Sequence, residues 1–285
     1  MQTWGFACGL AGSVNLNAFA GILCCDLENT PECAFDCWRR RPIHSAAPKF
    51  LWGHAMPNQP LWASVSGKTI NITYPSQKRF DLAGKSLSDL DAWRLASALD
   101  GTIVSVSVPG DGFLYDLYGV NSTYYAGVSL RRIKETTGAN GTELVLVNDG
   151  FYLQDNFQHE GRAWAALALQ VEVAQKLGFS RIEVQAQGGE ARLLTHYTGH
   201  IQWPKLGFDG PAPSCVWEAL DDATAARLGL GKHSLVSDYL KSSDGRRLWA
   251  AHGRGCTLTI ELAPPSQGAK NLLACAANKP STVRV

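Results

Sequence analysis

A helix pattern bracketed by glycines and followed by a strand pattern constrains this chain more than any other feature. Residues 162–177 contain neither Pro nor Gly, and their apolar side chains recur at the spacing of one helix face. Gly178 stands where a left-handed residue commonly ends a helix, and apolar and polar side chains then alternate over residues 180–187. The stretch predicts a strand-helix-strand unit whose helix begins beside Gly161.

The beginning of this helix predicts a binding site for an anion. The first amide groups of a helix have no partner inside it, and the positive end of its dipole attracts negative charge. Gly161 has no side chain and Ala163 has a small one, so an extended ligand can approach the backbone closely. A diphosphate is the ligand that such a turn suits.

The same residues resemble the acyl-CoA signature of the GNAT superfamily of N-acyltransferases. That signature reads Gln or Arg, any two residues, Gly, any residue, then Gly or Ala, and Gln158, Gly161 and Ala163 occupy those places. The segment from Trp203 to Phe208 is similar to a Tyr-x-x-x-Gly-Phe segment of the family, with Trp203 in place of the tyrosine. The family's small residue late in the helix, glycine, aromatic residue and Arg-Ile pair also have counterparts in register: Ala174, Gly178, Phe179, Arg181 and Ile182.

The resemblance, which covers residues 65–210, implies a fold class and an organisation. We expect an α/β protein of the α+β type, a divergent bacterial or phage-type member of the superfamily. Its GNAT-like mixed, mostly antiparallel sheet is flanked by helices. Residues 1–64 form a Cys-rich N-terminal extension, and residues 65–285 form the acyltransferase domain, with a helical C-terminal addition from about residue 211.

Alternation, turn residues and capping residues predict the remaining elements. Ser88 predicts the N-cap of a helix. Turns such as 109–112 and 138–141 join four of the strands that we expect into hairpins: 102–108, 114–120, 124–134 and 143–153. Two further strands are expected at 68–74 and 256–263. The helices that we expect besides 162–177 are 88–99, 216–228, 234–251 and 266–277.

The resemblance implies acetyl-CoA, or another acyl-CoA, as co-substrate, held through the backbone amides of the turn. Arg162 adds a positive charge there. The predicted binding residues are Phe157, Gln158, His159, Glu160, Gly161, Arg162 and Ala163.

Direct attack of an amine on a thioester needs a base for the amine and an acid for the departing sulfur. Asp149, Asp155 and Glu160 are the carboxylates nearest the turn along the chain, and we favour Asp155. The alternative is that Asp155 and Glu160 only cap the positive end of the following helix.

The acid is harder to assign because the family commonly uses the tyrosine that Trp203 replaces here, and an indole has no titratable proton to give. Tyr197, His196 and His200 are the alternatives, and a histidine in such a segment is more often a surface or hydrogen-bonded residue. The predicted catalytic residues are Asp155, Tyr197 and His200.

Composition excludes several other classes of function. The 285 residues are 45% hydrophobic and 18% charged, as in globular proteins, and the net charge of +1 gives no reason to expect nucleic-acid binding. A run of eighteen apolar residues is absent, so we expect no membrane span. The apolar start of the chain lacks a basic leader and is a poor signal peptide. We expect a cytoplasmic protein.

The eight cysteines are too sparse for a disulfide scaffold in a chain of this length. Their spacing also lacks the paired C-x-x-C pattern of structural zinc sites, so we predict no metal site. The alternative is a metal site that uses Cys24 or Cys25, Cys33 and Cys37, with His44 or His54.

The first functional hypothesis is an acyl-CoA-dependent N-acyltransferase whose acceptor is an amine of a small molecule or a protein. The second is a catalytically inactive GNAT-like module that binds or supports a larger assembly or a phage-type particle, which Trp203 and the long flanking segments favour. The third is an effector or toxin that acylates a host macromolecule, with residues 1–64 as its recognition element. Composition does not separate the first from the third.

Overall fold

The computed structural model describes residues 65–67, 69–74, 81–82, 85–121, 123–125, 128–138, 141–154, 161–188 and 199–278. Contacts divide the chain after residue 54, and every described residue belongs to the unit formed by residues 55–285. The predicted boundary between residues 64 and 65 falls at the margin of the described part and stays a prediction.

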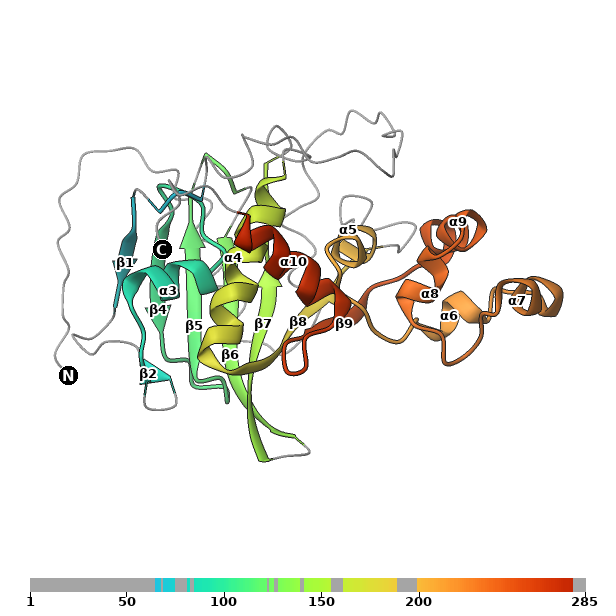
Figure 1. The fold of residues 1–285 in the computed structure, drawn as a ribbon, viewed down its shortest axis with the longest axis horizontal. Coiled ribbons are helices and arrows are strands. Elements are labelled where there is room, and N and C mark those ends of the chain that lie inside the picture. The colour runs from blue at the N-terminus through green and yellow to red at the C-terminus, as the bar shows by residue number, and fades with distance from the viewer. Residues whose placement is uncertain are drawn as a thin grey trace, which may run out of the picture. The chain divides into compact units, whose positions relative to one another are not determined.

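A seven-stranded mixed sheet forms the centre of this unit (Figure 1), in the order β1-β4-β5-β6-β7-β8-β9. Neighbouring strands are antiparallel except β1 with β4 and β7 with β8, which are parallel. The architecture confirms the predicted mixed, mostly antiparallel sheet. Its strands are β1 Asn71–Thr73, β4 Ile103–Ser107, β5 Tyr115–Val120, β6 Val128–Gly138, β7 Gly141–Gly150, β8 Phe179–Ala186 and β9 Cys256–Glu261. The short strands β2 Asp81–Leu82 and β3 Lys85–Ser86 form a separate ribbon.

The predicted hairpins are present, but the hairpin of β6 and β7 lies later in β6 than the sequence indicated. Its ladder extends to the pair Gly138 and Gly141, because β-branched threonines continue both strands up to the glycine turn. The predicted outer ends of the two strands are represented only by a single bridge between Tyr125 and Leu153.

The two faces of the sheet differ in chemistry. One face carries apolar rows of cross-strand neighbours, and the other carries paired charges. One row on the apolar face is Tyr115, Ile133, Leu146, Ile182 and Ile260. The next row toward the end of β7 is Val106, Leu117, Arg131, Asn148, Val184 and Leu258, so two polar residues interrupt it.

Three helices cover the apolar face (Figure 1): α3 Asp89–Leu95, α4 Arg162–Leu177 and α10 Gln267–Ala277. Helix α4 has the predicted bounds, and the left-handed Gly178 ends it by donating its N–H to the carbonyls of Ala174 and Gln175. Ser88 caps α3 as predicted. This helix ends earlier than expected, because Ser97 adopts a positive φ of 50°.

The C-terminal helices are shorter than predicted. The helix expected at 216–228 is divided into α6 Ser214–Trp217 and α7 Asp222–Leu228, and the one expected at 234–251 into α8 Val236–Leu240 and α9 Ser243–His252. The divisions have a local cause, because the Asp221 carboxylate caps α7 and the Ser242 hydroxyl caps α9. Side chains of this type compete with the continuation of a helix. Helix α5, Gly199–Lys205, precedes this group.

Candidate functional site

The parallel strands β7 and β8 part at their carboxyl ends. Their register runs from Leu144 with Phe179 to Asn148 with Val184, whereas β7 continues to Gly150 and β8 to Ala186. The outer ladders continue, since β6 pairs with β7 as far as Gly150 and β9 pairs with β8 as far as Ala186. We call this gap beyond Asn148 and Val184 the β7–β8 notch. Ligands of open α/β sheets commonly bind outside the carboxyl ends of strands, at such a change of connection.

The start of α4 follows β7 and therefore lies toward the same edge of the sheet. Gly161 precedes the helix with φ 76° and ψ 1°, a left-handed conformation that favours glycine. The first turn carries no acidic residue, and the amides of Arg162, Ala163 and Trp164 precede the first intrahelical bond, from Ala165 N–H to the Gly161 carbonyl. Of the predicted cofactor-binding residues, Gly161, Arg162 and Ala163 are described, whereas Phe157, Gln158, His159 and Glu160 lie outside the described residues.

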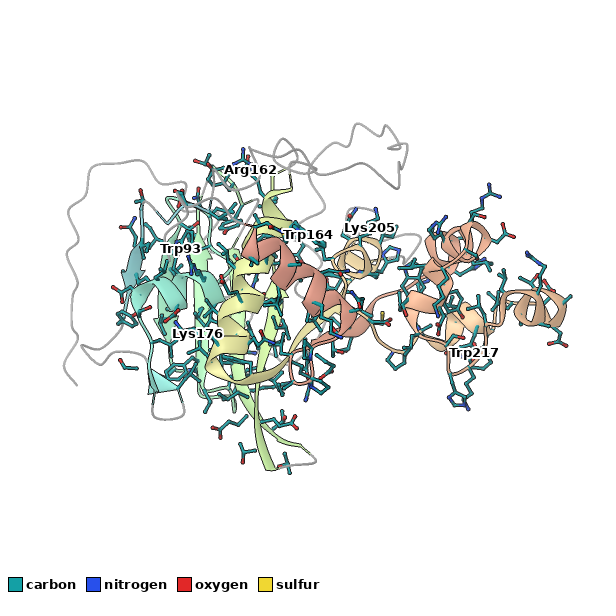
Figure 2. All side chains as sticks on the ribbon, viewed as in Figure 1. Trp93, Arg162, Trp164, Lys176, Lys205 and Trp217 are labelled. Atoms are coloured by element: carbon teal, nitrogen blue, oxygen red, sulfur yellow. The ribbon has the colours of Figure 1, made fainter. Side chains whose placement is uncertain are left out.

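Arg162 marks this end of α4, and Lys176 marks the other (Figure 2). The Arg162 guanidinium lies over the Tyr124 ring, 5.2 Å from its centroid. The Tyr124 carbonyl accepts the Gln154 N–H at 2.8 Å, so the same residue contacts the chain that leaves β7. The residue that begins α4 therefore holds its cation against an aromatic ring, and the charge that the sequence predicted Arg162 to add to a diphosphate site stays a prediction.

Aromatic rings connect this end of α4 with the end of β7. The rings of Tyr125 and Phe151 meet edge to face at 6.0 Å, and burial raises the pKa of Tyr125. The Tyr125 hydroxyl donates to the Ser97 carbonyl and accepts the Leu99 N–H, each at 3.2 Å. The turn after α3 is thereby fixed beside the notch.

Arg131 is the charged residue on the apolar face that the sequence analysis did not identify. Its side chain is fully buried, and its Nη1 donates to the carbonyl oxygens of Leu130, at 2.9 Å, and of Gly150. The Phe151 ring lies 5.0 Å from its guanidinium carbon. Burial lowers the pKa of Arg131 to about 10, so the group is charged at neutral pH.

A pair of buried amides lies next to Arg131. The side chains of Asn148 and Gln170 donate to each other at 3.1 and 3.0 Å, and Gln170 also donates to the Leu95 carbonyl at 2.7 Å. Each polar group therefore has a partner, and the pair joins β7, α4 and the end of α3. Their role is to hold α4 against β7.

Asp149 is the extra residue of a bulge in β7, because Leu130 pairs with Gly150 and Arg131 with Asn148. Bulges are frequent beside active sites, where they redirect side chains. Burial and the nearby Asp116 raise the pKa of Asp149, against the opposing effect of the Arg132 guanidinium. It is the described member of the three candidate bases. Asp155, which the sequence favoured, and Glu160 lie outside the described residues, as does Tyr197.

His200 lies in α5, where its backbone contacts α9. Its N–H donates to the Gln187 carbonyl just beyond β8, and its own carbonyl accepts the Trp249 indole N–H at 2.8 Å. The ring is buried and its Nδ1 has no partner. Burial and the nearby Arg254 lower the pKa of His200, which favours the neutral ring. Its catalytic role stays a prediction.

Trp203, which replaced a tyrosine in the sequence resemblance, is also buried. It lies in α5, and its ring meets Phe208 edge to face at 5.0 Å. Only 8% of the residue is exposed. Trp203 therefore serves as part of the core.

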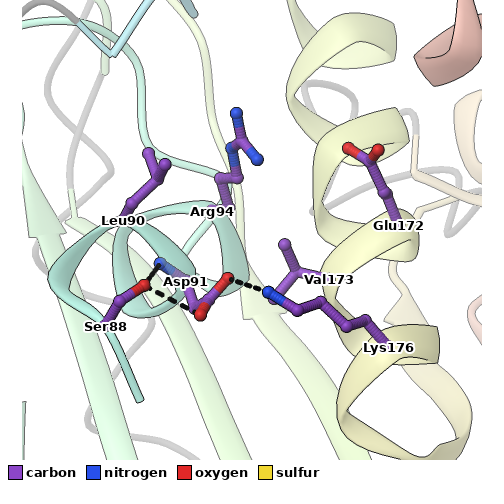
Figure 3. Close-up of a pocket in the computed structure, with 7 residues that line it drawn as sticks. All are labelled: Ser88, Leu90, Asp91, Arg94, Glu172, Val173 and Lys176. Carbon is purple, nitrogen blue, oxygen red and sulfur yellow. Dashed lines mark hydrogen bonds and ion pairs between the residues drawn. The ribbon is translucent and has the colours of Figure 1, made fainter. Parts of the chain in front are cut away.

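A cleft of about 310 Å³ lies elsewhere, between α3 and α4 (Figure 3). Lys176 and Asp91 form an ion pair of 3.4 Å across it, and Glu172 and Arg94 bring further charges of both signs. Glu172 is eleven residues beyond Gly161, about 16 Å along the helix axis. The cleft is therefore separate from the start of α4.

The described cysteines are free thiols: Cys215, Cys256 and Cys275. Burial raises the pKa of Cys256 to about 11, which suppresses the reactive thiolate. Within the described ranges, no group of three or more potential ligands could hold a metal ion. The cysteines of the alternative metal site lie outside those ranges. Within the same described ranges, no helix is long and apolar enough to cross a membrane.

Comparison of the chain with protein-family models and with curated proteins found no match.

Proposed function

We propose that this chain is an N-acyltransferase that moves an acyl group, acetyl in the first instance, from acyl-CoA to an amine. The observation that carries the proposal is the β7–β8 notch beside the start of α4. Parallel strands that part next to a helix start offer one place for a diphosphate and another, between the strands, for the reacting groups.

The residues at the start of α4 fit a diphosphate. Gly161 has no side chain to obstruct the first amides, the first turn carries no acidic residue that would repel a negative ligand, and Arg162 adds a positive charge. When bound, acyl-CoA supplies an acyl carbon activated as a thioester. The amides of Arg162, Ala163 and Trp164 are the described groups that would hold its diphosphate.

The chemistry assigns different tasks to the residues near the notch. The amine gives up a proton as its bond to the acyl carbon forms, and the sulfur gains one as its bond to that carbon breaks. Asp149 is the candidate base that the structure describes, and its raised pKa would strengthen it as a base, but its carboxylate contacts Arg132 at 3.8 Å on the face of paired charges. Asp155 as base, and Tyr197 or His200 as acid, remain predictions from the positions of these residues in the sequence.

Calorimetric titration with acetyl-CoA tests the cofactor, using two matched variants. Gly161→Asp and Gly178→Asp place the same side chain at a left-handed glycine at opposite ends of α4, so their backbone strain is comparable. We expect micromolar binding by the parent, about −8 kcal/mol. Gly161→Asp should weaken it at least tenfold, because a carboxylate enters the diphosphate site, and Gly178→Asp should preserve it. Absence of heat in the parent contradicts the cofactor, and equal binding by both variants contradicts its location.

A second candidate function is an acyl-CoA-binding module without transfer, because Trp203 is buried where the family has its proton donor. Release of free CoA thiol, measured with a panel of amines, separates the two. Thiol release that requires an amine indicates transfer. Acetyl-CoA binding without any amine-dependent release indicates the binding module.

A further inference from the structure

The guanidinium of Arg131 has donors that the protein does not use. Its Nε and Nη2 are buried and have no hydrogen-bond partner. The ion pairs of the described residues include Arg132 and Arg181 but not Arg131. Burying a charge without a partner is strongly unfavourable, and native proteins retain few such groups. An unpartnered buried guanidinium therefore indicates a ligand.

The identity of the unused atoms specifies the shape of that ligand. Nη1 is occupied by the carbonyls of Leu130 and Gly150. The remaining Nε and Nη2 form one edge of the planar group, from which two N–H bonds point in parallel. This edge matches the two oxygens of a carboxylate, which it binds side on with two hydrogen bonds.

The guanidinium that carries this edge lies at the end of β7, beside the β7–β8 notch. Gly150, whose carbonyl Nη1 contacts, is the last residue of β7, and Phe151 lies against the guanidinium. Ser129 lies two residues earlier on the same face of β6, about 7 Å along the strand, and its buried Oγ also lacks a partner. The unused polar atoms thus continue along the strand, where a second polar group of the same ligand can bond.

We propose that Arg131 binds the carboxylate of the acyl acceptor and that the acceptor is a free amino acid. The carboxylate follows from the unused edge of Arg131, and the amine follows from the proposed function, on which this part of the inference rests. One guanidinium and one carboxylate form a neutral pair, as a buried site requires. A phosphate dianion would leave a net negative charge on the apolar face.

Thermal unfolding of the full chain with single L-amino acids tests the inference without acyl-CoA. The probes are the twenty amino acids and, for each that binds, its carboxamide. At about one hundred times the dissociation constant, an amino acid that fits should raise Tm by roughly 5 °C, and its carboxamide should not. A panel in which no amino acid raises Tm overturns the proposal, and so does an equal shift with the carboxamide.

Two variants of Arg131 and one of its neighbour locate the binding. Arg131→Lys keeps a charge but loses the paired edge, and Arg131→Met loses both, so each should weaken binding by roughly a hundredfold or more. Arg132→Lys, on the opposite face, should bind as the parent does. Unliganded Arg131→Met should melt at or above the Tm of the parent, because removing a buried charge without a carboxylate partner outweighs the loss of the two bonds from Nη1 to the Leu130 and Gly150 carbonyls. Binding retained by both Arg131 variants overturns the assignment, and a lowered Tm of Arg131→Met indicates a structural role instead.

The two proposals can fail separately. Acetyl-CoA binding without any Arg131-dependent amino-acid binding leaves the proposed function standing and overturns the acceptor. Amino-acid binding that requires Arg131 without acetyl-CoA binding confirms the carboxylate site and contradicts the transferase.

Discussion

Two adjacent arginines of β6 lie on opposite faces of the sheet and have opposite surroundings. Arg132 contacts three carboxylates, those of Asp111, Asp116 and Asp149, and its guanidinium lies 3.7 Å from the centroid of the Phe113 ring. Arg131, under the helices, has two backbone carbonyls and no carboxylate among the described ion pairs. An arginine on the face of paired charges, which we call the open face, thus has carboxylate partners. An arginine on the apolar face, which the helices cover and which we call the covered face, has none among the described ion pairs.

The difference separates structural charges from a charge available for a ligand. On the open face, Lys134 contacts Glu183, which also contacts Arg181, which in turn contacts Glu143, so the pairing is complete within the protein. On the covered face Asn148 and Gln170 satisfy each other, which shows that this interior accepts polar groups when they have partners. Arg131, which lies beside them, lacks such a partner for two of its nitrogens.

The largest expected effect tests whether side chains on the covered face contribute more to the free energy of unfolding than side chains on the open face. Leu146 is fully buried under the helices, whereas Val147, the next residue of β7, lies on the face of paired charges and is only partly buried. We expect Leu146→Ala to lower the free energy of unfolding by about 3 kcal/mol. Val147→Ala should lower it by less than about 1 kcal/mol. Urea denaturation measures both, and equal losses would contradict the assignment of the faces.

The second effect tests the polar pair on the covered face. Gln170→Leu keeps the volume but leaves the Asn148 amide and the Leu95 carbonyl without their partner. We expect a loss of about 2 kcal/mol, because buried groups remain unsatisfied. Adding Asn148→Val removes one of those groups, so the double variant should be less destabilised than the sum of the single variants. An additive result in urea denaturation would show that the pair is not coupled.

Local signals were sufficient to predict α4 to the residue. Its interior contains only residues compatible with a helix, and the left-handed glycines Gly161 and Gly178 flank it. The hairpins were likewise predicted because glycine turns separate alternating segments. The division of the C-terminal helices was not predicted, since Asp221 and Ser242 act as caps only after the chain has turned at those positions.

The sequence did not predict that Arg131 lies on the covered face, and the reason differs from that for the C-terminal helices. From Leu130 to Ile133 the sequence reads Leu-Arg-Arg-Ile, so each face of β6 receives one apolar residue and one arginine. Alternation alone does not indicate which face the helices cover. The bulge at Asp149 depends on pairing with a distant strand and has no local signal.

The third effect compares the two arginines directly. Arg132→Met removes the cation beside Asp116, whose side chain is only 5% exposed, and should lower the free energy of unfolding by about 1 kcal/mol. Arg131→Met removes a charge that has no carboxylate partner in the described part of the chain, and should leave that energy unchanged or raise it. Urea denaturation of both variants measures whether each substitution lowers or raises the free energy of unfolding. A larger loss for Arg131→Met than for Arg132→Met would show that the guanidinium serves the fold.

The smallest effect concerns the acid stability of the face of paired charges. Burial acts to raise the pKa of Glu183, but hydrogen bonds from Lys134 and Arg181 outweigh it, so the pKa is lowered in the folded state. A lowered carboxylate pKa stabilises the fold above the unfolded value, near 4.3, and this contribution is lost as the pH falls through the folded value.

Glu183→Gln removes this contribution. At pH 7 the variant should be less stable than the parent by under about 1 kcal/mol, because the side chains of the cluster are partly exposed. The difference should shrink as the pH falls below about 4, since the parent then loses the same interaction. Urea denaturation from pH 7 to pH 3 measures it, with the exposed Glu218→Gln as control. A difference that stays constant over this range would show that the charge of Glu183 adds nothing to the pairing, and that packing alone accounts for the matched face.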